Sequence, residues 1–487
     1  MKPLDFGRSD DPRVQAQLDR LSALSVPQGR LGLETIRALL ERLGNPHRKL
    51  PPVFHVAGTN GKGSTCAFLR AMLEAEGYRV HVTTSPHLVR YNERIRLAGE
   101  LISDKALAAV LAEVLDAGED LGPSFFEVTI AAAFLAFSRT PADACVVEVG
   151  MGGRFDATNV LEPEVLAACG IAALGLDHER FLLAPEEGVP QEPMARIAFE
   201  KAGIAKKGVP LVTLYYPEPG FDPPLKEVPG QPPEIDYDLL DSDEKYDPVV
   251  NPAIEDVAER VGAPLHVGGN VGSWAIQANW RAPEKVRYAD WQESSGKQTS
   301  FVLPRPNLAG EHQIENAGLA IAMLRHQQQV RVTMDAIAKG LVRVKWPARL
   351  QRLSPGPLIG HREVWLDGGH NPNAAQRLFA FLNRHIYADR ILATGELRPI
   401  HLIIGMIEGK DPTALTAPLA TLLASITAVP VPGHDWHPAS AFGPSARAAP
   451  DVPSAMAMIP EDGLPILIAG SLYLAGEVLR LNNELPD

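Results

Sequence analysis

The sequence predicts an α/β fold with two domains, on two observations. Apolar runs that end in glycine-rich or polar stretches recur in the first 180 residues, as in PPVFHVAGTNGKGS, ACVVEVGMGGRFD and EVLAACGIAALGLDH. Such runs are typical of strands buried on both faces of a parallel sheet. Segments with helical periodicity lie between them, which indicates a doubly wound arrangement.

Two helices between these strands can be placed in order. The first follows the first glycine-rich stretch and should end at Gly77; its apolar residues at helical spacing are Phe68, Leu69, Met72 and Leu73. The second, SDKALAAVLAEVLDAG, opens at Ser103 as a cap and ends near Gly118.

The second domain is predicted from a return of the same rhythm. A proline-rich, acidic stretch at about 215–250 has little periodicity, so we interpret it as an inserted loop that is partly disordered. From about Pro304, the stretches EVWLDGGHN, PIHLIIGM and LPILIAGSLYLAGEVL again join an apolar strand to a turn and a helix. We therefore assign residues 1–300 to a first domain and 305–487 to a smaller α/β domain.

Composition narrows the class of protein. The 487 residues carry 46 Lys and Arg against 59 Asp and Glu, a net charge of -13, which argues against a broad nucleic-acid-binding surface. The three cysteines form no CxxC pair, so neither a disulfide framework nor a thiolate zinc site is indicated. With no apolar signal core and no run of about 20 apolar residues, we expect a cytoplasmic protein without membrane contact.

The glycine-rich loop after the first strand has the build of a phosphate-binding loop. Its glycines allow backbone N–H groups to turn inward, and the following helix adds positive potential at its N-terminus. Lys62 would reach the β- and γ-phosphates, so a nucleoside triphosphate is the expected ligand. The spacing departs from G-x-x-x-x-G-K-[ST], and the alternative is a glycine turn with a surface lysine. The loop residues are Gly58, Thr59, Asn60, Gly61, Lys62, Gly63 and Ser64.

A magnesium ion at this loop would need oxygen ligands from the C-terminal edge of the same sheet. Glu148 interrupts the apolar strand VVEVG near its end, where an unpaired buried carboxylate would be costly. We interpret Glu148 as a metal ligand, with a buried salt bridge to Arg154 as the alternative. His178, in LGLDH, also ends a strand and either ligates a metal, orients a substrate or is an ordinary loop histidine.

Nine motifs, in one order, resemble the folylpolyglutamate synthase and dihydrofolate synthase family, which is related to the Mur ligases. The resemblance spans residues 30–475 and implies an N-terminal ATPase domain and a Rossmann-like C-terminal domain, with ATP and a pterin bound between them. The motifs are HVAGTNGKGS, TTSPHLVRYNERIRLAGELIS, SFFEVTIAAAFLAF, VVEVGMGGRFDATNV, LGLDH, IAFEKAGI, GEHQIENAGLAIAML, WPARLQ and LDGGHNPNA.

The resemblance implies roles for specific residues. Magnesium would be held by Ser85, Glu148 and His178, together with Ser64, and the γ-phosphate would lie on the glycine-rich loop. The implied nucleotide contacts in the second domain are Asn316, Arg349 and Asp367. From the residues alone, these would be a helix residue, a surface arginine and a helix or turn cap.

Lys201 of EKAGI matches the position at which this family carries a carbamylated lysine. The chemistry is reasonable, because a desolvated lysine loses its proton and the neutral amine takes up CO₂. The resulting carboxylate would help to bind a second magnesium ion. The sequence alone would give a solvated lysine at a helix end.

The pterin end of the site is carried by three short segments. RLGLETI resembles the N-terminal segment that touches the pterin, and SFFE and GGRFD lie where the family contacts dihydropteroate. The implied residues are Leu31, Gly32, Leu33, Phe126, Gly153 and Arg154. One departure is the stretch between His178 and Lys201, which is longer than the usual spacer, so the loop that carries the second metal ligand is expected to differ in shape.

The implied reaction is ATP-dependent formation of an amide bond. The carboxylate of dihydropteroate or tetrahydrofolate attacks the γ-phosphate to give an acyl phosphate, which the amine of L-glutamate then attacks. Lys62 would stabilise the transferring phosphoryl group, His370 of DGGHN would position glutamate or the carboxylate, and the domains would close around ATP. We expect a monomer with both activities. The alternatives are a Mur-type peptidoglycan precursor ligase and a catalytically inactive nucleotide-binding relative.

Overall fold

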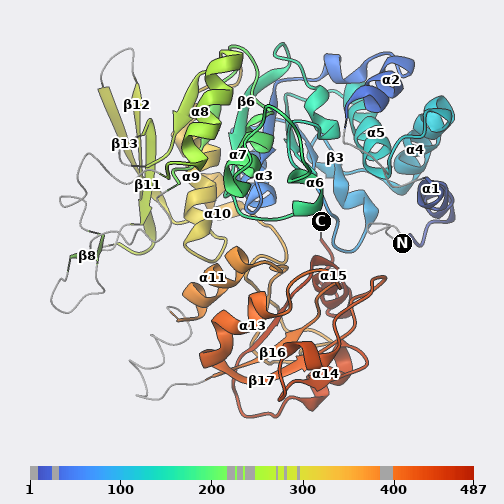
Figure 1. Ribbon diagram of the computed structural model, residues 1–487, viewed down its shortest axis with the longest axis vertical. Helices are drawn as coiled ribbons and strands as arrows, with labels where there is room; N and C mark the ends of the chain where they lie inside the picture. Colours follow the sequence, from blue (N-terminus) through green and yellow to red (C-terminus); the bar gives the residue numbers. More distant parts are fainter. Residues whose placement is uncertain are drawn as a thin grey trace.

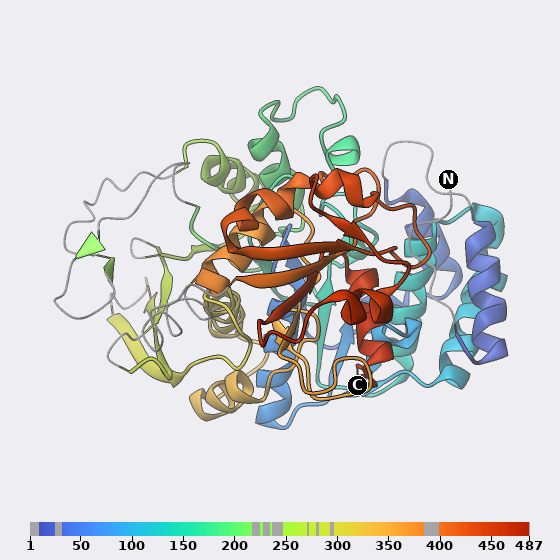
Figure 2. The ribbon, with the colours of Figure 1, turned by 90° about the horizontal axis from the view of Figure 1, so that it is seen from below.

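Two stacked α/β units make up the chain, with the first above the second in Figure 1. The computed structural model describes residues 9–24, 32–216, 225–226, 234–235, 247–269, 272–278, 282–292, 297–383 and 399–486. Seen from below, the sheet of the second unit lies in front of the first unit (Figure 2). The predicted α/β class with mainly parallel sheets is confirmed in both units.

The first unit is built on an 8-stranded sheet in the order β10-β7-β6-β1-β5-β2-β3-β4. The strands from β10 to β2 run parallel, and β3 and β4 add antiparallel pairs at one edge. Every residue of β1, β5 and β6 is buried, as the apolar runs predict. The bounds are β1 Val53–Ala57, β2 Val80–Thr83, β3 Ile95–Leu97, β4 Glu100–Leu101, β5 Ala144–Glu148, β6 Leu166–Ile171, β7 Leu211–Thr213 and β10 Leu265–Val267.

Helices cover both faces of this sheet. The apolar core on one face includes α4 Asp104–Gly118, α5 Phe125–Arg139, α7 Pro193–Ala202 and α8 Val250–Val261, with α1 Pro12–Ala23 and α2 Glu34–Arg42 packed on α4 and α5. The other packs on α3 Lys62–Glu76, α9 His312–Arg325 and α10 Met334–Arg343. The predicted helix ends are confirmed: Gly77 caps α3 in a left-handed conformation, and the Ser103 hydroxyl accepts from the N–H of Ala106 at the start of α4.

The first unit extends beyond the predicted boundary at 300. An antiparallel sheet, β11 Trp274–Ala278, β12 Lys285–Gln292 and β13 Lys297–Pro304, lies against α9. Helices α9 and α10 pack on α3, so the apolar core of this unit continues to Val344. Most of the predicted insertion at about 215–250 lies outside the described residues; within it, β8 Leu225–Lys226 and β9 Glu234–Ile235 pair antiparallel.

The second unit is a smaller sheet in the order β14-β15-β19-β16-β17-β18, parallel except for the β14–β15 pair. The strands are β14 Gln351–Arg352, β15 Val364–Leu366, β16 Ile400–Ile404, β17 Leu423–Ala428, β18 Arg447–Ala448 and β19 Ile466–Ala469. One face packs on α14 Val452–Met458 and α15 Leu472–Leu481, and the other on α11 Pro372–Phe381 and α13 Thr413–Leu419. Among the described residues, no helix is long and apolar enough to cross a membrane.

Candidate active site between the two units

The glycine-rich loop joins β1 to α3 at the C-terminal edge of the first sheet. Gly58 has φ +149° and Gly61 has φ +82°, backbone conformations that residues other than glycine rarely adopt. A Cβ at Gly61 would lie 2.3 Å from the Asn316 Oδ1, so Asn316 of α9 packs directly on the loop. An α-helix leaves its first N–H groups without an intrahelical acceptor, and those of α3 begin at this loop. The loop has the geometry of an anion site.

Two lysines converge on one carbonyl of this loop. Lys62 Nζ lies 3.0 Å and Lys201 Nζ 2.9 Å from the carbonyl oxygen of Gly58. Lys201 is 4% exposed, and burial together with the positive Lys62 lowers its pKa to about 7. Because two amino groups share a neutral acceptor, an anion between them would be strongly favoured.

Glu148 ends β5 next to the loop. Its Oε2 accepts from the backbone N–H of Ser85 at 3.0 Å, and its side chain is buried. Burial raises the pKa of Glu148, and Lys62 offsets part of that rise. The alternative partner, Arg154, is engaged by Glu186 and Glu200 instead. A buried carboxylate facing a cationic loop fits a divalent cation.

The remaining predicted metal ligands are only partly grouped. Ser64 is buried in the first turn of α3, and His178 lies in a loop, not at a strand end as predicted, because β6 stops at Ile171. Partial burial lowers the pKa of His178, which favours the neutral imidazole that metals bind. In the described part of the chain, no three His, Cys, Asp or Glu side chains are grouped to hold a metal. The full ligand set stays a prediction.

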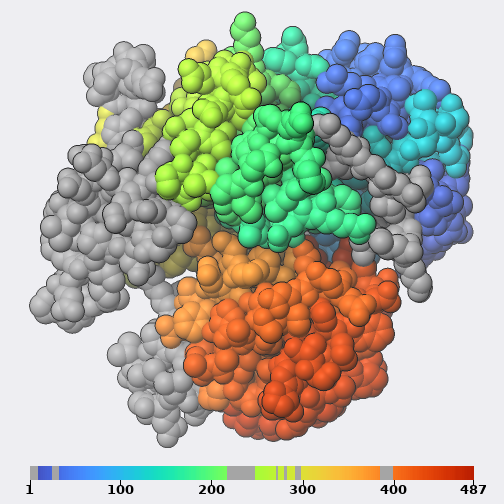
Figure 3. Space-filling view, in the orientation of Figure 1, coloured from blue at the N-terminus to red at the C-terminus, as the bar shows by residue number. Residues whose placement is uncertain are grey.

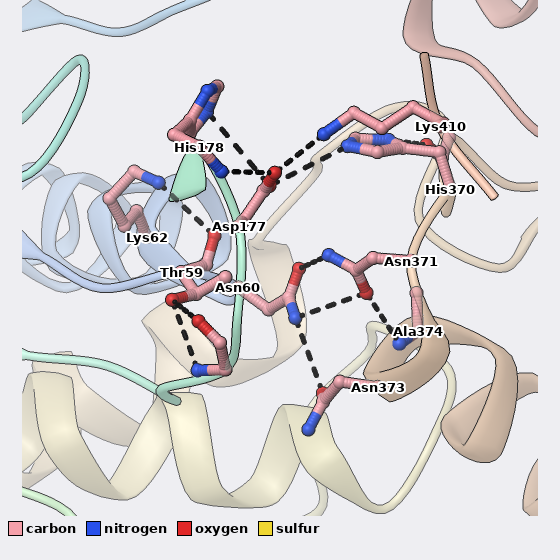
Figure 4. Close-up of polar contacts among 12 residues, drawn as sticks. Thr59, Asn60, Lys62, Asp177, His178, His370, Asn371, Asn373, Ala374 and Lys410 are labelled. Carbon is pink, nitrogen blue, oxygen red and sulfur yellow. Dashed lines mark hydrogen bonds and ion pairs between the residues drawn. The ribbon is translucent and has the colours of Figure 1, made fainter. Parts of the chain in front are cut away.

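Contacts from the second unit reach the loop (Figure 4). The Asn60 and Asn371 side chains bond to each other, with the Asn371 Nδ2 3.1 Å from the Asn60 Oδ1, and Asn60 also reaches Asn373. Asn371 caps α11 through the N–H of Ala374. The loop is therefore bonded to the start of a helix of the other unit.

A second bridge joins the units at Asp177. Lys410 Nζ lies 2.5 Å from its Oδ1, while the Nε2 atoms of His178 and His370 lie 3.9 and 4.0 Å from its Oδ2. Burial opposes ionisation, but His178 and Lys410 hold the pKa of Asp177 below its usual range. Neither Asp177 nor Lys410 was predicted from the sequence. Lys410 follows the strand of PIHLIIGM, at the C-terminal edge of a sheet where ligands commonly bind, and this position could have indicated a functional residue.

The three predicted nucleotide residues surround the junction of the units. Asn316 donates to Gln313 at 3.0 Å, and Asp367 accepts from the N–H groups of Leu350 and Gly369. Asp367 thus closes a turn after β15 and caps no helix. Residues 344–350, between α10 and β14, form the linker that joins the units. Arg349 of this linker lines a cavity with residues of both units, among them Gly63, Ser85, Glu148, Trp346 and Leu472.

The predicted pterin residues lie on separate elements. Leu31 lies outside the described residues, and Gly32 and Leu33 precede α2. Phe126 of α5 lies against Gly150, where a Cβ would be 2.3 Å from its ring. Gly153 and Arg154 lie against the end of α7, which carries Lys201. The structure therefore connects the last two residues with Lys201 and leaves the pterin contacts as predictions.

Comparison with known proteins gives a consistent family. No protein-family model matches the chain. The dihydrofolate synthase/folylpolyglutamate synthase of Bacillus subtilis is 33% identical over 377 residues, covering 74% of each chain. The enzyme of the same name from Escherichia coli is 32% identical over 419 residues, covering 86% of this chain and 80% of its own. The dihydrofolate synthetase of Saccharomyces cerevisiae is 29% identical over 483 residues, covering 93% and 98%.

Solved structures agree with these relatives. E. coli FolC in complex with DHPP and ADP has a TM-score of 0.75 at 28% identity, covering 96% of this chain and 97% of its own. A bifunctional folylpolyglutamate synthase/dihydrofolate synthase with Mn, AMPPNP and L-glutamate bound has a TM-score of 0.72 at 27% identity, covering 98% and 99%. With sequence and fold in agreement, the chain belongs to the dihydrofolate synthase/folylpolyglutamate synthase family of ATP-dependent glutamate ligases.

Proposed function

We propose that this chain joins L-glutamate to the carboxylate of dihydropteroate and of tetrahydrofolate in an ATP-dependent reaction. The observation that carries the proposal is the convergence of Lys62 and Lys201 on the Gly58 carbonyl, beside Glu148 and at the junction of the two units. The B. subtilis and E. coli relatives bear both activities in their names, and this supports both acceptors.

ATP and magnesium fit the residues at this loop. The backbone of the loop and Lys62 would hold the β- and γ-phosphates, and Arg349 of the linker and Asp367 of the second unit would contact the rest of the nucleotide. Glu148, Ser85, Ser64 and His178 would supply oxygen and nitrogen ligands. The metal, when bound, neutralises charge on the phosphates. Manganese and AMPPNP in a solved relative support this assignment.

Lys201 is proposed to carry a carbamate that serves a second magnesium ion. Its Nζ is buried within 2.9 Å of the phosphate loop, and its lowered pKa leaves a substantial fraction of the amine neutral near pH 7. A neutral amine is the form that adds CO₂. Conversion to an anion would also relieve the repulsion between the two lysines.

The reaction proceeds through two displacements. The pterin carboxylate oxygen attacks the γ-phosphorus and ADP leaves, which gives an acyl phosphate; Lys62 stabilises the transferred charge. The neutral amine of glutamate then attacks the acyl carbon, the proton that its nitrogen loses passes to His370, and inorganic phosphate leaves as the amide forms. Because the site holds the reactants together in a reactive orientation, the entropic part of the activation barrier is lowered.

His370 is suited to receive the glutamate amine. Its Nδ1 lies 3.0 Å from the Gly368 carbonyl and so carries the proton, which leaves Nε2 as an acceptor near Asp177. Burial lowers the pKa of His370, so the ring stays neutral at pH 7. A neutral Nε2 accepts a hydrogen bond from the attacking amine.

We further propose that the enzyme acts as a cytoplasmic monomer.

Phosphate release with magnesium, ATP and L-glutamate tests this function, with dihydropteroate, tetrahydrofolate or no pterin added. We expect release with each pterin and little without one. Glu148→Gln should lower the rate at least a hundredfold, because the metal loses its buried carboxylate. Asp143→Asn, at the opposite end of β5, is the matched control and should keep the rate. A folded wild-type protein that binds ATP but is silent with both pterins would refute the proposal and favour a Mur-type substrate.

A further inference from the structure

The segment that lengthens the connection between His178 and Lys201 has an ordered structure. Gln191 Nε2 donates to the carbonyls of Glu186 and Val189, at 3.1 and 2.8 Å. Glu192 then caps α7 by accepting from the N–H of Ala195 at 2.6 Å. Figure 3 shows the green surface that includes α6 Glu179–Leu182 and α7 directly above the second unit. Hydrogen bonds therefore fix this segment where it enters α7, the helix that carries Lys201.

Glu186 brings this segment into a network of four charges. Its carboxylate accepts from Arg154 Nη2 at 2.6 Å and from Arg196 Nη2 at 2.9 Å. Both arginines also donate to Glu200, at 2.7 Å from Arg154 and 3.0 Å from Arg196. The side chains of Arg196 and Glu200 are only 6% and 5% exposed. The two guanidinium groups and the two carboxylates therefore neutralise each other in a largely buried network.

The network ends at the backbone of Lys201. The N–H of Arg154 donates to the carbonyl of Glu200 at 2.7 Å. A Cβ at Gly153 would lie 2.9 Å from the carbonyl oxygen of Lys201 and 3.0 Å from its Cα, so the turn packs directly on the helix end. From there the Lys201 side chain reaches the Gly58 carbonyl. Hydrogen bonds and packing therefore connect the side chains of the network to the backbone of Lys201.

We infer that Glu186 is a positioning residue for Lys201. It neutralises the arginine pair, and the balanced pair holds Glu200 and the end of α7 at the distance from which Lys201 meets the phosphate loop. The inference rests on the proposed function only for the role of Lys201 in turnover. Without Glu186, two guanidinium groups would share one carboxylate, and their repulsion would displace the end of α7. Because a displacement of about 1 Å at such a site can lower rates by about a hundredfold, a smaller shift of Lys201 should still slow turnover measurably.

The test compares Glu186→Gln with Glu187→Gln, which removes the same charge from the neighbouring exposed residue. For E186Q we expect a kcat about tenfold lower, a pterin KM within twofold of wild type, and a magnesium activation midpoint severalfold higher. Affinity for a non-hydrolysable ATP analogue with magnesium, measured by calorimetry, should fall about fivefold. E187Q should match wild type in all four. The calorimetry needs no turnover, so it tests Glu186 even if the protein proves inactive with pterins.

A double variant separates positioning from general support of the fold. In the Arg196→Met background, E186Q should add little further loss, because both residues act through Glu200. If E186Q raised the pterin KM and left kcat, the magnesium midpoint and analogue affinity unchanged, positioning of Lys201 would be refuted. Equal effects of E186Q and E187Q, or a loss confined to thermal stability, would refute it as well.

Discussion

Lys201 is a buried lysine whose charged form costs the fold stability. It is buried near a second lysine, and both effects disfavour its charged form, with burial the larger. An ordinary lysine has a pKa of about 10.4, against about 7 here. Between these values the unfolded chain binds a proton that the folded chain does not, so the stability of the fold rises with pH across this window.

Replacing Lys201 with Met should therefore stabilise the protein while abolishing turnover. In bicarbonate-free buffer the gain in unfolding free energy should be largest at and below about pH 7 and shrink toward about pH 10, because the native penalty fades as the lysine deprotonates. Denaturant unfolding at several pH values measures it. Lys207→Met, at an exposed position, is the control. A K201M protein less stable than wild type at low pH would contradict this account of Lys201.

The positions of several candidate-site residues in the fold were predictable, because local sequence fixes them. Lys62 follows a glycine loop between a strand and a helix, and Glu148 interrupts an apolar strand. The partners of Asp177 were not predictable, because Lys410 lies 233 residues further along the chain. Spacing along the sequence says nothing about which loop of another unit will face a given carboxylate.

At the scale of elements, caps and fully buried strands were predicted well, and packing was not. The residues around α3 and α4 carry their own end signals, Gly77 and Ser103. The strands β11 to β13 went unrecognised, because part of their side-chain surface is exposed and their apolar runs are weak. The helices α9 and α10 fell on the wrong side of the predicted boundary, since their apolar faces do not reveal which sheet they cover.

The Lys410 bridge joins the loop after β16 to the loop after β6. Lys410→Met would leave Asp177 buried without its cation, which favours separation of the units. We expect about a tenfold loss of turnover and a larger radius of gyration in X-ray scattering. Lys339→Met, which removes an exposed pair on α10, should change neither. Unchanged scattering and turnover in K410M would show that this bridge does not hold the units together.

For the whole molecule, the site exists only where the two units meet. Asn60 and Asp177 belong to the first unit, and Asn371, Asn373 and Lys410 to the second. We therefore expect ligand entry and product release to require the units to move apart and close again.

A disulfide between the units tests this motion. A Cβ at Gly175 would lie 3.9 Å from the Cβ of Asn373, within the range of a disulfide. Oxidised Gly175→Cys/Asn373→Cys protein should lose at least tenfold in turnover and recover on reduction, while each single variant should not respond to reductant. The three native cysteines are buried and free, so they should not interfere. Equal rates in the oxidised and reduced forms would show that opening is not needed.

The most direct test of the account follows the carboxylate oxygen. Dihydropteroate labelled with ¹⁸O in its carboxylate is turned over with ATP, magnesium and L-glutamate, and the released phosphate is analysed by mass spectrometry. Activation as an acyl phosphate at this loop predicts that each phosphate carries one labelled oxygen, since the carboxylate oxygen leaves with it. Amide product accompanied by unlabelled phosphate would contradict the mechanism.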